Sequence, residues 1–121
     1  MMIEKERAEF IKRAYDMIRP SPGMYSLDQA LYVFALYFQE YEQHTGGRHP
    51  NIRFEQIRFF IERFHQCEGP PPLNYFDLEV DDYKEIIPAY FRTRYREPCD
   101  RNINHFMSGD IRFMKFLEEC Y

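Results

Sequence analysis

Apolar residues recur at intervals of three and four along most of the chain, the spacing that places side chains on one face of an α-helix. The first such segment runs from about Glu4 to Ile18. Its apolar positions are Ile3, Phe10, Ile11, Ala14, Met17 and Ile18. The pattern stops at Pro20 and Pro22, which lack the amide donors that would continue a helix. We therefore predict an amphipathic helix that is followed by a turn.

The next segment contains nine consecutive apolar residues, from Ala30 to Phe38. Ser26 and Gln29 precede it with the spacing of a capping box, in which each side chain pairs with a backbone amide at the helix start. A buried strand is the alternative for the apolar run alone. The pattern as a whole, from the capping box to the polar continuation at Gln43, is however too long for an ordinary strand. We predict a helix over about 26–43, ended by Gly46 or Gly47, as the central element of the fold.

Two further helices are predicted in the middle of the chain. The first follows Pro50, with Asn51 as its cap. Its apolar face consists of Ile57, Phe60, Ile61 and Phe64. The segment Gly69-Pro70-Pro71-Pro72 then indicates a stiff extended connector. The second helix has Asp81 or Asp82 as its predicted cap. Its apolar face consists of Tyr83, Ile86, Ile87, Tyr90, Phe91 and Tyr95.

Pro88 lies within this second pattern and leaves two possibilities. Either it kinks a continuous helix near Lys84, or a short turn precedes a new helix that has Pro88 in its first turn.

The end of the chain predicts two short helices, Asp100 to Met107 and Asp110 to Cys120, separated by Ser108 and Gly109. Ile111, Met114 and Leu117 form the expected apolar stripe of the last one. The length of 121 residues suits one domain. The predicted fold is therefore an all-α, single-domain bundle over residues 1–121, with about five or six helices around the central one.

Charge is distributed unevenly along the chain. The net charge of −4, from 16 basic and 20 acidic residues, argues against a globally basic nucleic-acid binder. Acidic residues are concentrated between positions 68 and 85, and clustered carboxylates suit docking on a basic partner. The helix dipole and general solubility explain the same cluster without a function. The candidate partner-binding residues are Asp77, Glu79, Asp81, Asp82 and Glu85.

Arginines alternate with aromatic residues between positions 90 and 101, a pattern that suits the stacking of bases and the binding of phosphates. The alternative nucleic-acid-binding residues are Arg92, Tyr95, Arg96 and Arg101. On a helix Arg92 and Arg96 share a face, but Arg94 lies about 200° away from Arg92. The aromatic residues also continue the core pattern, so buried aromatics at a solvated helix end are the favoured interpretation.

No catalytic, metal or cofactor site is predicted. The four histidines belong to no recognisable catalytic motif, and the three cysteines form no CxxC pair. His65 and Cys67 lack the second pair of ligands that a structural zinc site requires. The glycines and Arg48 between His44 and His49 follow a helix instead of a strand, which favours an inter-helix turn over a phosphate loop. An enzyme is therefore the least favoured class.

The remaining features favour a small cytosolic interaction protein, an accessory factor or inhibitor that binds a macromolecular partner. Unpaired cysteines suit a reducing compartment, and the first residues are charged where a secretory signal would be apolar. No apolar run is long enough for a membrane helix. Surface tyrosines often mark interfaces, and the chain has ten. A protein partner is favoured, a homodimer is compatible with the sequence, and a single-stranded nucleic-acid binder is the alternative.

Overall fold

A computed structural model describes residues 3–18, 21, 23–68, 75–96 and 99–120. The helices in this part of the chain are α1 (Lys5–Met17), α2 (Leu27–Thr45), α3 (Phe54–Arg63), α4 (Val80–Arg92), α5 (Ile103–Met107) and α6 (Ile111–Glu119). They pack against one another as a small helical bundle, which confirms the predicted fold class. Within the described residues, no helix combines the length and the apolar character needed to cross a bilayer.

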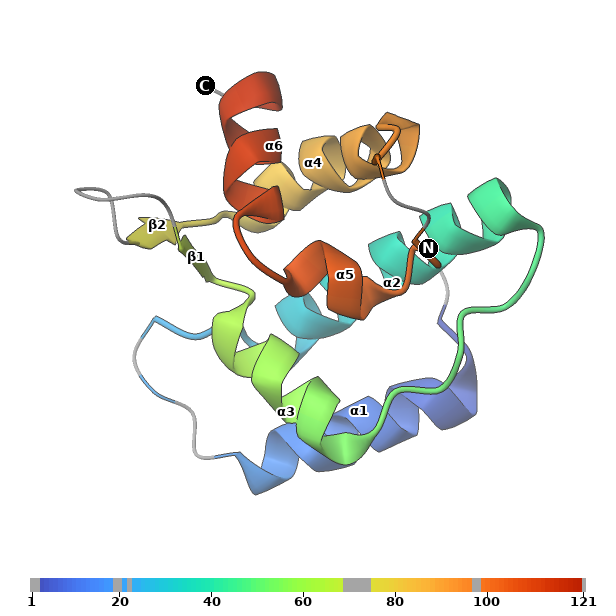
Figure 1. Cartoon of the computed structure of the whole chain (residues 1–121). Helices are drawn as coiled ribbons and strands as arrows, with labels where there is room; N and C mark the ends of the chain where they lie inside the picture. Colours follow the sequence, from blue (N-terminus) through green and yellow to red (C-terminus); the bar gives the residue numbers. More distant parts are fainter. Residues whose placement is uncertain (1–2, 19–20, 22, 69–74, 97–98, 121) are drawn as a thin grey trace.

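Helix α2 is the central element, as predicted. It lies between the α1–α3 pair and the α4–α6 pair (Figure 1). The six residues from Val33 to Phe38 are all buried, so the helix contacts neighbours on every side of that stretch. The capping box is also present: the Ser26 amide donates to Gln29 Oε1 at 2.8 Å, and the Gln29 amide donates to Ser26 Oγ at 3.2 Å. Gly46 ends the helix with a φ of 78°, a conformation that glycine adopts without strain.

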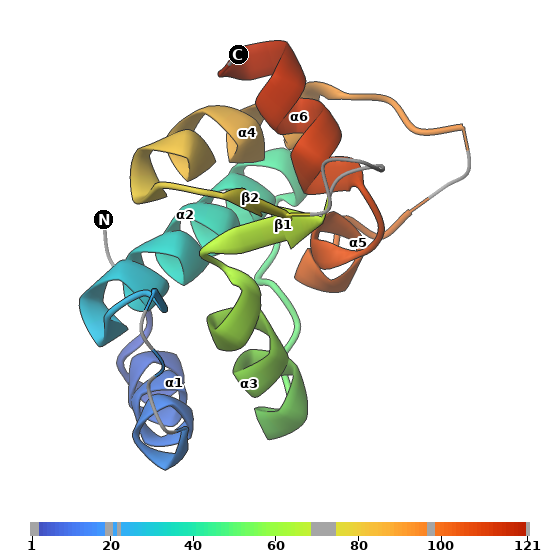
Figure 2. The ribbon, with the colours of Figure 1, turned by 90° about the vertical axis from the view of Figure 1, so that its left-hand side faces the viewer.

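Two short strands connect α3 to α4. β1 (Gln66–Glu68) and β2 (Tyr75–Asp77) pair antiparallel, with Cys67 opposite Phe76 (Figure 2). A backbone hydrogen bond of 2.8 Å from Leu78 to His65 closes the base of this pair. The predicted proline connector, Gly69 to Pro72, lies outside the described residues. Sequence periodicity did not predict these strands, because three residues are too few to establish an alternating pattern.

Two predicted helix caps were wrong. Helix α3 begins at Phe54, because the Gln56 side chain reaches back 3.1 Å to the Arg53 amide. Asn51 instead accepts a hydrogen bond from Arg7 at 3.4 Å. Helix α4 likewise begins earlier than predicted: its N-cap is Glu79, whose amide donates to Asp82 Oδ2 at 2.8 Å. The Asp82 side chain, at the third position of α4, therefore caps the start of the helix.

Helix α4 is continuous through Pro88, so the alternative of a turn and a new helix was wrong. Most of its predicted apolar face is buried, namely Tyr83, Ile86, Ile87, Tyr90 and Phe91. Tyr95 lies beyond the last residue of the helix and is half-buried.

The predicted apolar stripe of α6 is confirmed for Ile111 and Leu117, which pack against the core, but it was wrong for Met114. Met114 is 45% exposed, whereas Arg112, Phe113 and Lys115 are buried. Arg112 Nη1 lies 2.9 Å from the Arg63 carbonyl and 2.8 Å from the Gln66 carbonyl. Arg63 is the last residue of α3, where backbone acceptors have no partner within the helix, and Gln66 is the first residue of β1. Arg112 therefore faces inward because it supplies the missing donors.

Buried tyrosines are also accommodated by hydrogen bonds. Tyr83 donates to the Phe64 carbonyl at 2.7 Å, and Tyr37 donates to the Arg101 carbonyl at 2.7 Å. Tyr90 Oη lies 2.6 Å from His105 Nδ1, and Tyr25 donates to the Leu78 carbonyl. Since each hydroxyl has a partner, these four tyrosines form part of the core and not an external surface.

Candidate functional site

Three residues of α3 form a stripe along its exposed side. Glu55, Phe59 and Arg63 are spaced by four, so their side chains lie on one face of the helix. Phe59 is 42% exposed, so a large part of its ring is in contact with water. The Arg63 guanidinium carbon lies 3.9 Å from the centre of the Phe59 ring, a cation–π contact that holds the ring in place.

A hollow of about 350 Å³ lies beside this stripe, between α3 and α5. It is lined by Glu55, Gln56, Phe59, Phe60, Asn104, Met107 and Ser108. A hydrogen bond of 3.0 Å from Gln56 Nε2 to Asn104 Oδ1 joins the two helices at the hollow. We call the stripe and the hollow together the α3 face. An exposed aromatic side chain beside an open apolar hollow is typical of a protein-binding surface.

The acidic residues singled out in the sequence gather around the start of α4. Asp77, Glu79, Asp81 and Glu85 are exposed, and Asp82 is half-buried. Asp81 pairs with Lys84 at 3.0 Å, and Asp82 accepts the capping hydrogen bond from Glu79. Two members of the cluster therefore have structural partners, which satisfies part of its charge locally.

The residues of the alternative nucleic-acid site lie at the end of α4 and in the segment that follows it. Arg101 donates to the Tyr90 carbonyl at 2.7 Å and to the Thr93 carbonyl at 2.5 Å, so its guanidinium satisfies acceptors at the end of α4. The Tyr95 ring lies against Arg101, with the guanidinium carbon 5.1 Å from the ring centre. Arg92 and Arg96 are exposed. Arg92 Nη2 also lies 4.0 Å from Glu119 Oε2 on α6. Three of the four side chains therefore make contacts within the chain.

Histidine His49 is buried, and both of its ring nitrogens are engaged. Nδ1 lies 2.8 Å from the Pro50 carbonyl, and Nε2 accepts a hydrogen bond of 3.1 Å from the Ile103 amide. Burial lowers the pKa of His49 to about 4, which keeps the imidazole neutral at pH 7. Burial also lowers the pKa of His65. His49 is therefore a structural side chain.

Metal ligands do not cluster in the part of the chain that the structure describes, where no group of three or more His, Cys, Asp or Glu side chains is placed to hold an ion. Cys99 and Cys120 are free thiols there. The side chain of Cys67, which was considered with His65 as a ligand, lies outside the described part.

The α3 face was not among the sites that the sequence predicted, although it leaves a signal there. Phe59 does not belong to the apolar face of Ile57, Phe60, Ile61 and Phe64. An aromatic residue off the core stripe, with opposite charges four positions to each side, marks an exposed surface. The hollow beside it could not be predicted, because α5 supplies one of its walls.

No protein-family model, no curated protein and no solved structure matches the chain. Any assignment of function therefore comes from the surfaces that its own side chains form.

Proposed function

We propose that the chain is a small cytosolic interaction protein, without enzymatic activity, whose α3 face binds a helix of a protein partner. The observation that carries this proposal is Phe59, which is 42% exposed beside an open apolar hollow. Aromatic side chains that enter a pocket across an interface contribute much of the binding energy. The free thiols of Cys99 and Cys120 are compatible with a reducing cytosol.

Charges on the α3 face define the partner. Glu55 and Arg63 lie on the two sides of Phe59 along the helix, about 12 Å apart. Arg63 Nη1 also lies 3.8 Å from Glu62 Oε2 in its own helix. A partner helix complements this face when it has a basic residue near Glu55, an acidic residue near Arg63 and an apolar residue between them.

A second copy of α3 meets these requirements when it runs antiparallel to the first. Phe59 then meets Phe59 at a twofold axis, and each Glu55 faces the Arg63 of the other copy. Such a self-complementary surface is what a symmetric dimer needs. We therefore infer that the interaction takes the form of a homodimer.

Sedimentation equilibrium between about 1 and 200 µM tests the homodimer. We expect a dimer whose dissociation constant rises at least about tenfold in Phe59→Ala, because the central anchor is lost. Glu55→Arg and Arg63→Glu should each weaken the dimer. The double variant Glu55→Arg/Arg63→Glu should recover most of the affinity, because the two ion pairs form again with reversed polarity.

Arg58→Glu is the matched control for these charge reversals. Arg58 lies on the side of the stripe away from Gln56 and Phe60, and it pairs with Glu62 at 3.1 Å in its own helix. We expect its dimer affinity to stay within about twofold of the parent. A monomer at every concentration, or a double variant that is as weak as the single ones, would overturn the homodimer. Host proteins captured equally well by Phe59→Ala would overturn the α3 face as the binding surface.

A further inference from the structure

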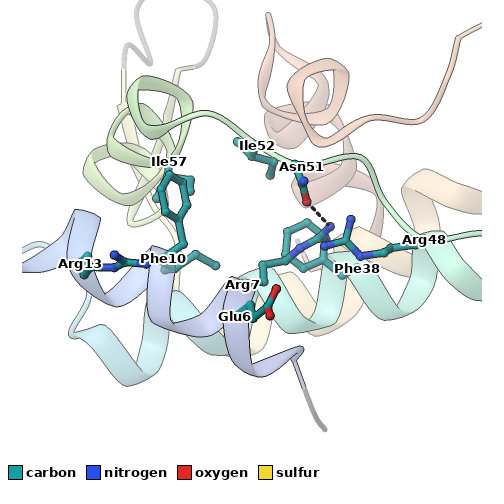
Figure 3. A pocket seen from close by; sticks show the side chains of 10 residues that line it. Glu6, Arg7, Phe10, Arg13, Phe38, Arg48, Asn51, Ile52 and Ile57 are labelled. Atoms are coloured by element: carbon teal, nitrogen blue, oxygen red, sulfur yellow. Dashed lines mark hydrogen bonds between the residues drawn. The ribbon is translucent and has the colours of Figure 1, made fainter.

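A second hollow lies on the other side of α3 from the hollow of the α3 face, between α1 and the segment 46–53 that leads into α3 (Figure 3). Its volume is about 310 Å³. It is lined by Glu6, Arg7, Phe10, Ile11, Arg13, Phe38, Arg48, Asn51, Ile52 and Ile57. We call this hollow the Arg7 cleft. Three arginines and one carboxylate line it, in a chain whose overall charge is negative.

The side chain of Arg7 is largely covered by its neighbours, and its charge is only partly compensated. Only 9% of its side chain is exposed, and its guanidinium carbon lies 4.3 Å from the centre of the Phe38 ring. Burial lowers the pKa of Arg7, which reflects the cost of removing its charge from water. The carboxylate that pairs with it, on Glu4, is 3.7 Å away and is held more closely by Arg48, at 2.7 Å. A partly buried charge of this kind gains from an additional anion.

The guanidinium also retains hydrogen-bonding capacity. Nη2 donates to the His49 carbonyl at 2.5 Å and lies 3.4 Å from Asn51 Oδ1. Within the described residues, no hydrogen bond uses Nη1. Glu6 lines the cleft but forms no ion pair with Arg7 there, and Arg13 has no ion pair in the same part of the chain. Arg7 Nη1 and the Arg13 guanidinium can therefore donate to a ligand while Arg7 keeps its contacts with the His49 carbonyl and Glu4.

Apolar side chains form the opposite side of the cleft. Figure 3 shows Phe10 standing beside Ile57, with Ile52 above the opening and Arg7 across from Phe10. Phe10 is 37% exposed, so its ring presents an uncovered apolar surface to the cleft. A ligand that fills the cleft would cover this surface while its charged end reaches Arg7. Such a combination of apolar walls and a few polar groups is typical of small-ligand sites.

We propose that the Arg7 cleft binds a carboxylate attached to an apolar group, with the carboxylate at Arg7 and the apolar group against Phe10, Ile52 and Ile57. The planar guanidinium matches the geometry of a carboxylate. The volume of about 310 Å³ suits an apolar group the size of one large side chain. Glu4, which precedes α1, and Glu6 and Glu9 within it disfavour a ligand with several negative charges, such as a chain of phosphates.

Titration followed by amide chemical shifts in two-dimensional NMR tests the ligand class. The probe is 3-phenylpropionate, with 3-phenylpropionamide and acetate as controls. We expect the shifts to map to residues that line the Arg7 cleft. The amide and acetate should each bind at least about tenfold more weakly, because one lacks the charge and the other lacks the apolar group. An amide that binds as tightly as the acid would overturn the proposal.

A peptide arm distinguishes the source of the carboxylate. Acetyl-Gly-Gly-Phe with a free carboxyl terminus represents a polypeptide end, and the same peptide with an amidated end is its control. Binding of the free-ended peptide at least as tightly as 3-phenylpropionate assigns the site to polypeptide termini. Binding of 3-phenylpropionate alone assigns it to small organic acids. If neither binds, the proposal is wrong.

Variants of α1 locate the site. Arg7→Met should weaken 3-phenylpropionate at least about tenfold, because the methionine keeps the stem of the side chain and loses the charge. Lys12→Met is the matched control, since Lys12 is exposed on the same helix and does not line the cleft. Phe10→Ala removes part of the apolar wall at a partly exposed position. It replaces Arg7→Met as the test variant if Arg7→Met does not fold. Unchanged affinity in Phe10→Ala, or an equal loss in Lys12→Met, would contradict the site.

Discussion

His49 Nε2 accepts a hydrogen bond from the amide of Ile103, 54 positions later in the chain, across 3.1 Å. Ile103 is the first residue of α5, where backbone amides have no acceptor within the helix. The other ring nitrogen, Nδ1, faces the Pro50 carbonyl at 2.8 Å and therefore carries the proton. A neutral imidazole thus joins the segment after α2 to the start of α5.

We predict that this arrangement makes stability depend on pH. The folded pKa of His49 is about 4, whereas an unfolded histidine titrates near 6.5, so the unfolded chain binds more protons between these values. The contribution is fully present above about pH 6.5 and decreases as the pH falls toward 4. Urea denaturation should show a loss of about 2 kcal/mol between pH 7 and pH 5.

His49→Gln is the control for this pH dependence. The variant should be less stable at pH 7, and it should lose less stability than the parent between pH 7 and pH 5. Burial also lowers the pKa of His65, which accounts for the pH dependence of stability that remains in the variant. An unchanged slope in the variant would show that His49 is not responsible.

Arg112→Met should destabilise the protein by about 2–4 kcal/mol, because it leaves buried acceptors without a donor. Arg112 Nη1 contacts the Arg63 and Gln66 carbonyls and lies 2.9 Å from Tyr83 Oη. Urea denaturation of Arg58→Met provides the control, since Arg58 is exposed and its loss should change the free energy of unfolding by less than about 0.5 kcal/mol. Equal effects of the two substitutions would contradict the role of Arg112.

Phe34→Ala should cost about 3–5 kcal/mol of stability. The Phe34 side chain is fully buried, and its ring centre lies 4.9 Å from that of Phe64 and 5.8 Å from that of Phe38. In the same thermal or urea assay, Phe59→Ala should cost less than about 1 kcal/mol, because much of that ring is already in water. A loss below about 1 kcal/mol in Phe34→Ala would contradict its place in the core.

The acidic residues near α4 are tested by changing Asp77, Glu79, Asp81 and Asp82 to their amides. If a basic partner docks there, we expect weaker capture, mainly through slower association. The fold should survive, because asparagine at position 82 can still accept the capping hydrogen bond. The variant Glu9→Gln/Asp16→Asn/Glu42→Gln/Asp110→Asn removes four negative charges from exposed positions elsewhere and is the control for net charge. Association that slows equally in both variants would show that the location of the charges does not matter.

Local signals in the sequence determined most of the helical architecture. The capping box of Ser26 and Gln29, the apolar run that follows, and Gly46 all act within a few residues, so the start, the burial and the end of α2 were predictable. The same applies to the apolar face of α3. The predicted caps of α3 and α4 were wrong, because the side chain at the third helical position, Gln56 or Asp82, supplies the capping hydrogen bond.

The tertiary structure alone decided which polar side chains face inward. Arg112 lies in α6, and its acceptor on Arg63 is 49 positions earlier in the chain, so no local pattern relates the two. The partly buried Arg7 and the buried His49 face inward for the same reason: their partners come from other elements. Both candidate surfaces follow from this packing, since α5 forms one wall of the α3 face and the segment 46–53 covers the Arg7 cleft. Hydrophobic periodicity reports burial by apolar neighbours, and it contains no information about backbone acceptors that a distant helix leaves unpaired.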